Sequence, residues 1–326
     1  MTGVVASAPG KVVLCGEYAV LGGAPAVCMA VDCRANVKVE HVDEAWNQVT
    51  APGYSSVEGR FVSEGTSLEW LQGEDEFSLV DAAWRTLRQF DKGGLSIELD
   101  TRAFFDVASG KKIGLGSSAA LTVALIAALT QSNDVLESAT RARRMFQHGA
   151  GSGVDIAAGV SGGLIEYHME GASILPLRWP DGLVFRLIWT GTPASTGIRL
   201  EHLKGAGHRL SREALAKAAT NMAAAWRSAS GIISQFPAYI EALRQFSDDY
   251  DLGIFDAGHD KLATEAAAAG LVYKPCGAGG GDVGIVLADN ATAVESFLGG
   301  ALGGSGQILD ARLDIEGVQA ERTDSG

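Results

Sequence analysis

Apolar residues in the first 40 positions follow the pattern of β-strands rather than the spacing of a helix. Residues 12–14 and 26–31 are short apolar runs, and residues 36–40 alternate between polar and apolar side chains. Short apolar runs are typical of buried strands, and alternation is typical of a strand with one wet face. We therefore expect residues 4–40 to be rich in β-structure and the polar residues 44–78 to form loops and short strands.

Helical spacing begins further along the chain. Apolar side chains three or four positions apart predict a helix over residues 79–90, whereas residues 95–99 alternate as a half-buried strand. Residues 113–133 carry no charge, but their small side chains predict a buried helix rather than a membrane span of about 20 apolar residues. Further helices are expected at 138–148, within 209–246 and at 256–269, with strands at 164–167, 183–189, 272–273 and 284–287.

The order of these elements indicates the fold class. It is neither a strict β-α-β alternation nor a succession of strands alone, so we expect an α+β protein. No repeat of fixed period is visible. A change in pattern near residue 194 predicts two domains, over residues 1–193 and 194–326.

Composition and charge exclude several classes of protein. Hydrophobic residues make up 47% of the chain and charged residues 20%, which supplies a sizeable core and excludes a disordered protein. A net charge of −13 argues against general binding to nucleic acid or to an acidic membrane surface. The 4 cysteines lack the spacing of a zinc site and indicate reduced thiols in a cytoplasmic protein.

Glycine is the outlier of the composition, with 42 of 326 residues against a usual share of ~7%. The glycines gather in three lysine-bearing segments, at residues 8–21, 111–120 and 274–282. In the third segment, residues 277–281 are all glycine except Ala278. A flexible loop explains that run, but so does a loop that closes around a ligand.

The second segment leads from Gly114 and Gly116 through Ser117 and Ser118 into the predicted buried helix. Glycine lets a backbone approach a ligand closely, and the N–H groups at a helix start carry partial positive charge. A phosphate group fits there without a basic side chain, and a serine hydroxyl can ligate Mg²⁺. The loop is neither a Walker A nor a G-x-G-x-x-G motif, and a simple turn capped by serine also accounts for it.

Two further polar features lie between the second and third segments. Asp155 follows a glycine-rich turn and enters an apolar stretch, where a carboxylate is costly unless it is paired. A helix-capping aspartate and a catalytic base beside a cation both fit this position. Arg141, Arg143 and Arg144 are most simply the solvated face of the predicted helix 138–148, with Arg144 as the candidate for a phosphate contact.

Taken together, these segments resemble the GHMP kinase superfamily in their order and spacing. Three motifs are most similar to the phosphomevalonate kinase group: K-x-G-L-G-S-S at 112–118, G-S-G-x-D at 151–155 and G-A-G-G-G-D at 277–282. Mevalonate kinases differ at two positions. They usually carry histidine where Tyr18 stands, and they place a magnesium-binding glutamate at the position of Arg144, 11 residues before Asp155.

The resemblance implies a GHMP kinase fold. Its N-terminal domain would be similar to ribosomal protein S5 domain 2, and its C-terminal domain would be ferredoxin-like. ATP and Mg²⁺ are the implied cofactors. The resemblance places Lys112, Gly114, Leu115, Gly116, Ser117, Ser118 and Ala119 on the nucleotide, with Ser118 also on the metal.

The resemblance also implies the roles of the remaining site residues. Asp155 and Lys11 are the implied catalytic residues. A phosphate acceptor is already ionised near neutral pH, since its second pKa is ~6, so Asp155 is expected mainly to position Lys11. The acceptor is expected to contact Lys11, Glu17, Tyr18, Lys112, Ser152, Gly153, Gly277, Ala278, Gly279, Gly280 and Asp282.

The implied reaction is ATP-dependent phosphorylation of 5-phosphomevalonate to 5-diphosphomevalonate, a step of the mevalonate pathway to isoprenoid precursors. A mevalonate kinase or another small-molecule GHMP kinase is the nearest alternative. A diphosphomevalonate decarboxylase and a catalytically silent ATP-binding sensor are more distant ones. The chain is expected to be a cytoplasmic monomer or homodimer, with a small-molecule substrate and no nucleic-acid or membrane partner.

Overall fold

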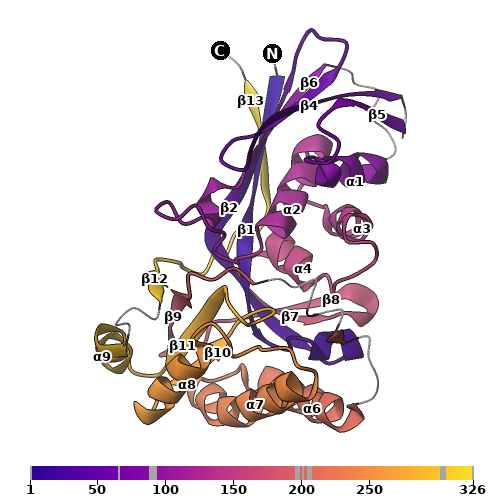
Figure 1. The fold of residues 1–326 in the computed structure, drawn as a ribbon. Helices are drawn as coiled ribbons and strands as arrows, with labels where there is room; N and C mark the ends of the chain where they lie inside the picture. The colour runs from indigo at the N-terminus through magenta and orange to yellow at the C-terminus, as the bar shows by residue number, and fades with distance from the viewer. Residues whose placement is uncertain are drawn as a thin grey trace.

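The computed structural model describes residues 2–64, 67–87, 94–194, 199, 202–203, 208–301 and 306–324. These residues form an elongated molecule with a large β-sheet toward one end and a smaller sheet toward the other (Figure 1). Helices and sheets are both present, which confirms the expected α+β class.

The larger sheet has nine strands in the order β13-β1-β2-β6-β3-β4-β5, with β7 on β2 and β8 on β7. Strands β3 and β6 pair in parallel, and the other pairs are antiparallel. The strands are β1 (Thr2–Cys15), β2 (Ala26–His41), β3 (Asn47–Ala51), β4 (Ser55–Glu64), β5 (Ser67–Gln72), β6 (Leu95–Asp100), β7 (Leu164–His168), β8 (Ser173–Leu177) and β13 (Gln319–Asp324).

Four helices lie on one face of this sheet (Figure 1). They are α1 (Ser78–Leu87), α2 (Ser117–Thr130), α3 (Leu136–Phe146) and α4 (Val154–Ser161). Helix α2 packs on β1, β2 and the other three helices, which buries Val123, Leu125 and Ile126 completely. This confirms the buried helix expected within residues 113–133. Across the described ranges, no helix combines the length and apolar character that crossing a membrane requires.

The smaller sheet is antiparallel, with the strand order β10-β11-β9-β12. Its strands are β9 (Val184–Trp189), β10 (Val272–Pro275), β11 (Val283–Ala288) and β12 (Gln307–Leu309). Helices α6 (Arg209–Ala225), α7 (Ala229–Asp249), α8 (His259–Ala268) and α9 (Ala291–Ala301) accompany it. Short 3₁₀ helices lie at η1 (Ala19–Gly22), η2 (Arg102–Phe104) and η3 (Glu170–Ala172).

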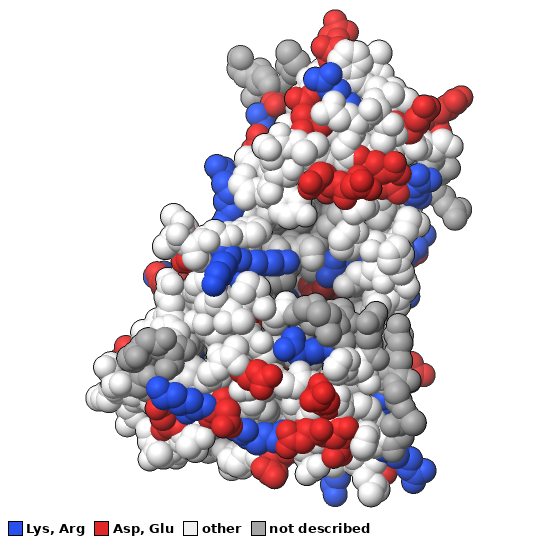
Figure 2. Space-filling view, viewed as in Figure 1, with Lys and Arg blue, Asp and Glu red and all other residues white. Residues whose placement is uncertain are grey.

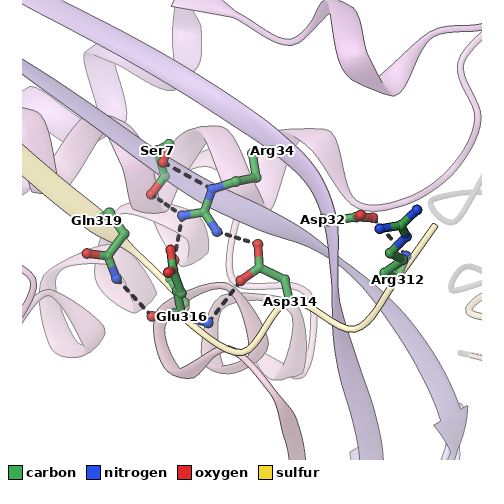
Figure 3. A network of polar contacts seen from close by, with 8 residues as sticks. Ser7, Asp32, Arg34, Arg312, Asp314, Glu316 and Gln319 are labelled. Carbon is green, nitrogen blue, oxygen red and sulfur yellow. Dashed lines mark hydrogen bonds and ion pairs between the residues drawn. The ribbon is translucent and has the colours of Figure 1, made fainter.

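The chain passes between the two sheets more than once. Strand β9 belongs to the smaller sheet although it precedes residue 194, and β13 returns to pair with β1. Beside that return, Arg34 pairs with Asp314 and donates to the carbonyl oxygens of Ser7 and Gly317 at 3.1 and 2.6 Å (Figure 3). The C-terminal segment is thereby fastened to β1 and β2. The expected boundary between residues 193 and 194 remains a prediction.

Candidate active site

The three glycine-rich segments of the sequence lie against one another between the two sheets. The backbone N–H of Lys11 donates to the carbonyl of Leu115 at 2.8 Å, which joins the first segment to the second. A Cβ atom on Gly114 would collide with Asp282, which shows how closely the third segment approaches the second. The Nζ atom of Lys11 lies 3.5 Å from the position that a Cβ of Gly277 would take. The three loops therefore build one site.

A cavity of about 480 Å³ lies where these segments meet. Figure 2 shows a recess midway along the molecule with basic side chains beside it, whereas acidic side chains gather above and below. Most of the expected site residues line the cavity: Lys11, Glu17, Tyr18, Lys112, Gly114, Gly116, Ser118, Ser152, Asp155, Gly277, Ala278 and Asp282. The expected residues Leu115, Ser117, Ala119, Gly153, Gly279 and Gly280 are not part of its lining.

Helix α2 opens onto the cavity without a capping side chain. Its N-cap is Gly116, whose φ of 85° is in the left-handed region that favours glycine, and no side chain accepts a bond from the first turn. The turn is therefore not capped by serine, the simpler explanation of this loop. Ser118 lines the cavity, and its hydroxyl has no hydrogen-bond partner among the described residues. An uncapped helix start with a free hydroxyl suits a phosphate group and its metal ion.

Within the described ranges, no group of three or more His, Cys, Asp and Glu side chains is placed to hold a metal ion. Mg²⁺ usually keeps several waters and binds through one or two protein ligands together with substrate phosphates. The cavity fits that arrangement, because Ser118 supplies one oxygen beside the helix start where phosphates would lie. The described residues therefore fit a magnesium ion that is held jointly with nucleotide phosphates rather than by a cage of protein carboxylates.

Asp155 lies in the first turn of α4 and forms an ion pair with Arg143 of α3. Arg143 Nη2 is 3.3 Å from Asp155 Oδ2, and the Asp155 side chain is 21% exposed. Gly153 occupies the N-cap position of α4, so Asp155 is not a capping residue. The structure thus agrees with a paired carboxylate. The partner, however, is Arg143, whereas the expected coupling of Asp155 to Lys11 is not among the ion pairs of the described residues.

The expectation of a solvated arginine face is wrong for Arg143. Its residue exposure is 9%, while Arg141 and Arg144 are exposed and outside the cavity lining. Arg143 shares the buried face of α3 with Ala139 and Ala142, three or four positions away. That spacing is the sequence signal that could have identified it. The lining also includes other residues not expected from sequence: Val13, Val20, Leu21, Phe146, Gln147, Val154, Pro193, Ala194 and Cys276.

Lys11, Lys112 and Arg143 bring positive charge together on the cavity wall. Partial desolvation lowers the pKa of Lys112, nearby Asp282 opposes this, and the neighbouring cations Arg143 and Lys11 lower it further. Burial raises the pKa of Asp282, although its carboxylate accepts a 2.9 Å bond from the N–H of Ala194. Like charges repel, so such a cluster is stabilised when an anion binds among them.

A second ion pair crosses from the first segment to the third. The side chains of Glu17 and Lys274 are 3% and 0% exposed and are directly bonded. The Tyr239 hydroxyl donates to Glu17 Oε2 at 2.5 Å and accepts from the N–H of Gly16 at 2.8 Å. Burial alone would lower the pKa of Lys274, but nearby Cys276 and Glu17 raise it above its usual value. The ammonium group therefore stays charged.

Two further contacts hold the third segment in place. Tyr18 donates from its hydroxyl to the carbonyl of Ala278 at 2.6 Å. His259 is fully buried, and its Nε2 lies 2.8 Å from the carbonyl of Gly281. A carbonyl only accepts, so Nε2 carries the proton and Nδ1 accepts from the Tyr273 hydroxyl at 2.7 Å. Burial lowers the pKa of His259 to about 4, so the ring is neutral.

Comparison with known proteins gives a family for this architecture. The profile described as "GHMP kinases N terminal domain" matches residues 78–163, which include α2, α4 and the loops before them. The chain contains a GHMP kinase N-terminal domain. The expected resemblance to the GHMP kinase superfamily is thereby confirmed, and the matched residues carry both Ser118 and Asp155.

Among similar GHMP kinases, phosphomevalonate kinase of Streptomyces sp. (strain CL190) is 29% identical over 88% of this chain and 90% of that protein. A mevalonate kinase of Methanothermobacter thermautotrophicus is 36% identical, but over 49% of this chain and 48% of that protein. The structure of Streptococcus pneumoniae phosphomevalonate kinase in complex with phosphomevalonate and AMPPNP superimposes with a TM-score of 0.79. It covers 95% of this chain and 99% of that one at 18% identity, which confirms the GHMP kinase fold.

Proposed function

We propose that the chain is an ATP-dependent kinase that phosphorylates 5-phosphomevalonate to 5-diphosphomevalonate, a step toward isoprenoid precursors. The observation that carries the proposal is the cavity where Lys11, Lys112 and Arg143 meet three glycine-rich loops and the uncapped start of α2. A relative that is 29% identical over 88% of this chain is a phosphomevalonate kinase. Both substrates of that reaction are anionic, which agrees with the cationic cavity of a protein with net charge −13.

Phosphoryl transfer depends mainly on positioning and on stabilising charge. The backbone at residues 114–119 would hold the ATP phosphates at the start of α2, where the helix contributes partial positive charge. Bound Mg²⁺ would neutralise phosphate charge, with Ser118 as its protein ligand. Lys11 lies between the second and third segments and would stabilise the transferring group.

The pairing of Asp155 with Arg143 agrees with an acceptor that needs no strong base. The phosphate of 5-phosphomevalonate is largely ionised near neutral pH, since its second pKa is ~6. Asp155 would therefore orient Arg143 and the acceptor. Residues 277–281 would close over the acceptor, held by Tyr18 and His259.

Mevalonate kinase is the second candidate, because relatives with that name match this chain at 36% identity over 49% of its length and at 28% identity over 87% of its length. Its acceptor is an alcohol, which must lose a proton during the reaction. Asp155, the expected base, is already engaged by a buried arginine. A cytoplasmic location and a monomeric or homodimeric state remain predictions.

Coupled ADP release from ATP and Mg²⁺ tests the proposal with 5-phosphomevalonate, mevalonate, galactose and homoserine as acceptors. We expect turnover chiefly with 5-phosphomevalonate, and chief turnover with any other acceptor would refute it. Lys11→Met removes a charge that would stabilise the transferring group, and Asp155→Asn disturbs the orientation of Arg143 and the acceptor, so each should lower kcat by about 10²-fold or more. Near-full turnover of both variants would show that the active site lies elsewhere, and an exchange of the exposed Lys38 to Met is the matched control.

A further inference from the structure

Arg143 is bonded less completely than its burial requires. A guanidinium group has five N–H donors, and burying them without acceptors is unfavourable. The ion pair with Asp155 engages Nη2. The Nε and Nη1 atoms are buried and have no hydrogen-bond partner in the part of the chain that the structure describes. Arg143 therefore has donor capacity that no described protein group uses.

The surroundings of Arg143 point to an anion as the missing partner. Arg143 lines the cavity together with Lys11 and Lys112, and both ammonium groups are near enough to interact with the same ligand. The ring of Phe146 lies 5.6 Å below the guanidinium and supports one of its faces. Two carboxylates, Asp155 and Asp282, share the cavity wall with these three cations, so positive charge is in excess among them. An anionic ligand would balance that excess.

We propose that Arg143 is the specificity-determining residue of the acceptor site, and that it binds the phosphate group of the acceptor while it holds Asp155. This inference rests on the proposed function and adds the residue that separates a phosphate acceptor from an alcohol. A planar guanidinium fork binds two oxygens of a phosphate or carboxylate at once, which the point charge of a lysine does not. One guanidinium group can thus donate to Asp155 along one edge and to a phosphate along another.

The electron balance of the reaction explains why this arrangement selects against alcohols. An oxygen of the acceptor phosphate donates a lone pair to the γ-phosphorus of ATP, and the bond from that phosphorus to the β–γ bridging oxygen breaks. ADP leaves with the bonding electrons, and an ionised acceptor releases no proton. An alcohol acceptor must pass one proton to a base, and the carboxylate placed to receive it is already paired with Arg143.

The test compares Arg143→Gln and Arg143→Lys with Arg141→Gln, an exposed arginine on the same helix. Steady-state rates are measured with 5-phosphomevalonate, with mevalonate and with varied ATP. Loss of a charge-assisted bond to phosphate should raise the KM of Arg143→Gln for 5-phosphomevalonate by about 10- to 100-fold. The KM for ATP should change less than about 2-fold, and the preference for 5-phosphomevalonate over mevalonate should fall by about 10-fold or more.

Arg143→Lys keeps the charge and guards against a folding defect in the glutamine variant. It should recover part of the acceptor KM, whereas Arg141→Gln should match the wild type throughout. An unchanged acceptor KM and preference in both Arg143 variants, with only kcat reduced, would overturn the inference and leave Arg143 as a positioning residue. A wild-type enzyme that ignores 5-phosphomevalonate would instead overturn the proposed function.

Discussion

Two ion pairs have at least one member on the wall of the cavity, and they differ in how completely their atoms are bonded. Glu17 and Lys274 are enclosed by protein, and each Glu17 oxygen has its own partner, Lys274 on one side and Tyr239 on the other. Arg143 and Asp155 meet at 3.3 Å, and two Arg143 nitrogens lack partners among the described residues. The first pair is complete without a ligand, whereas the second has unused donors beside a cavity.

This difference separates a structural role from a binding role for chemically similar groups. Buried ion pairs rarely gain more from attraction than they lose by leaving water, unless their geometry and hydrogen bonds are good. The Glu17–Lys274 pair meets that condition and joins the first loop to the strand that leads into the third. The Arg143–Asp155 pair does not meet it within the protein alone, so a bound anion is the natural completion.

The largest effect is expected from breaking the complete pair. Lys274→Met leaves the Glu17 carboxylate buried without a cation, which should lower the free energy of unfolding by about 3–5 kcal/mol. Chemical denaturation followed by tryptophan fluorescence measures it. The double variant Glu17→Gln with Lys274→Met removes both charges and should recover more than half of the loss.

A double variant as unstable as the single one would contradict this interpretation, since packing rather than an orphaned charge would then dominate. Arg143→Gln supplies the other half of the comparison. It leaves Asp155 unpaired but partly exposed, at 21%, so its stability loss should be clearly smaller than that of Lys274→Met.

Measuring the free energy of unfolding as a function of pH tests a contact that holds the third glycine-rich segment in place. His259 holds the third loop as a neutral ring, and burial lowers its pKa to about 4 from the usual 6.5. As the pH falls, the unfolded state therefore takes up a proton on His259 before the folded state does. The contribution of the neutral ring to stability is fully present above pH 6.5 and is lost as the pH drops toward 4. The full loss in the free energy of unfolding is about 3 kcal/mol, because each unit of difference between the folded and unfolded pKa corresponds to about 1.4 kcal/mol.

The variant His259→Gln retains a donor for Gly281 and an acceptor for Tyr273 but does not titrate. Carboxylates contribute equally to both proteins, so the difference between their unfolding free energies isolates His259. The wild type should lose about 3 kcal/mol more than the variant between pH 7 and 4. Parallel curves would show that folding does not lower the pKa of His259 and would contradict its placement as a buried neutral ring.

The parts of the site that sequence predicted are those that depend on neighbouring residues. The glycine-rich loops, the start of α2 and Asp155 at the start of α4 each follow from a local order of residue types. The partners of charged groups depend instead on distant contacts. Glu17 and Lys274 are 257 positions apart, and no local pattern relates them.

Two elements show the same limit in the fold. The polar stretch 44–78 contains β3, β4 and β5, which confirms the strands expected among its loops, but the length of β4, ten residues, was not expected. β4 and β5 are stabilised by pairing with their neighbours in this stretch, and β3 also pairs with β6, so partners outside each segment decide the strands, which local propensity does not register. Arg143 was misplaced for a related reason. Its charge suggested a solvated face, but the packing of α3 against its neighbours turned that face inward.

The smallest expected change in stability distinguishes a charged hydrogen-bond acceptor from a neutral one. Tyr239→Phe removes a hydrogen bond to the Glu17 carboxylate and leaves the N–H of Gly16 without its acceptor, whereas Tyr18→Phe removes one bond to the carbonyl of Ala278. Bonds to charged groups contribute about 1.5–3 kcal/mol and neutral ones about 0.5–1.5 kcal/mol, so Tyr239→Phe should destabilise the protein more. Burial and the neighbouring Glu17 raise the pKa of Tyr239 well above its usual value, which keeps it a donor. Equal losses in denaturant titrations of the two variants would mean that Glu17 is not a charged acceptor, and the contrast between the two ion pairs would then disappear.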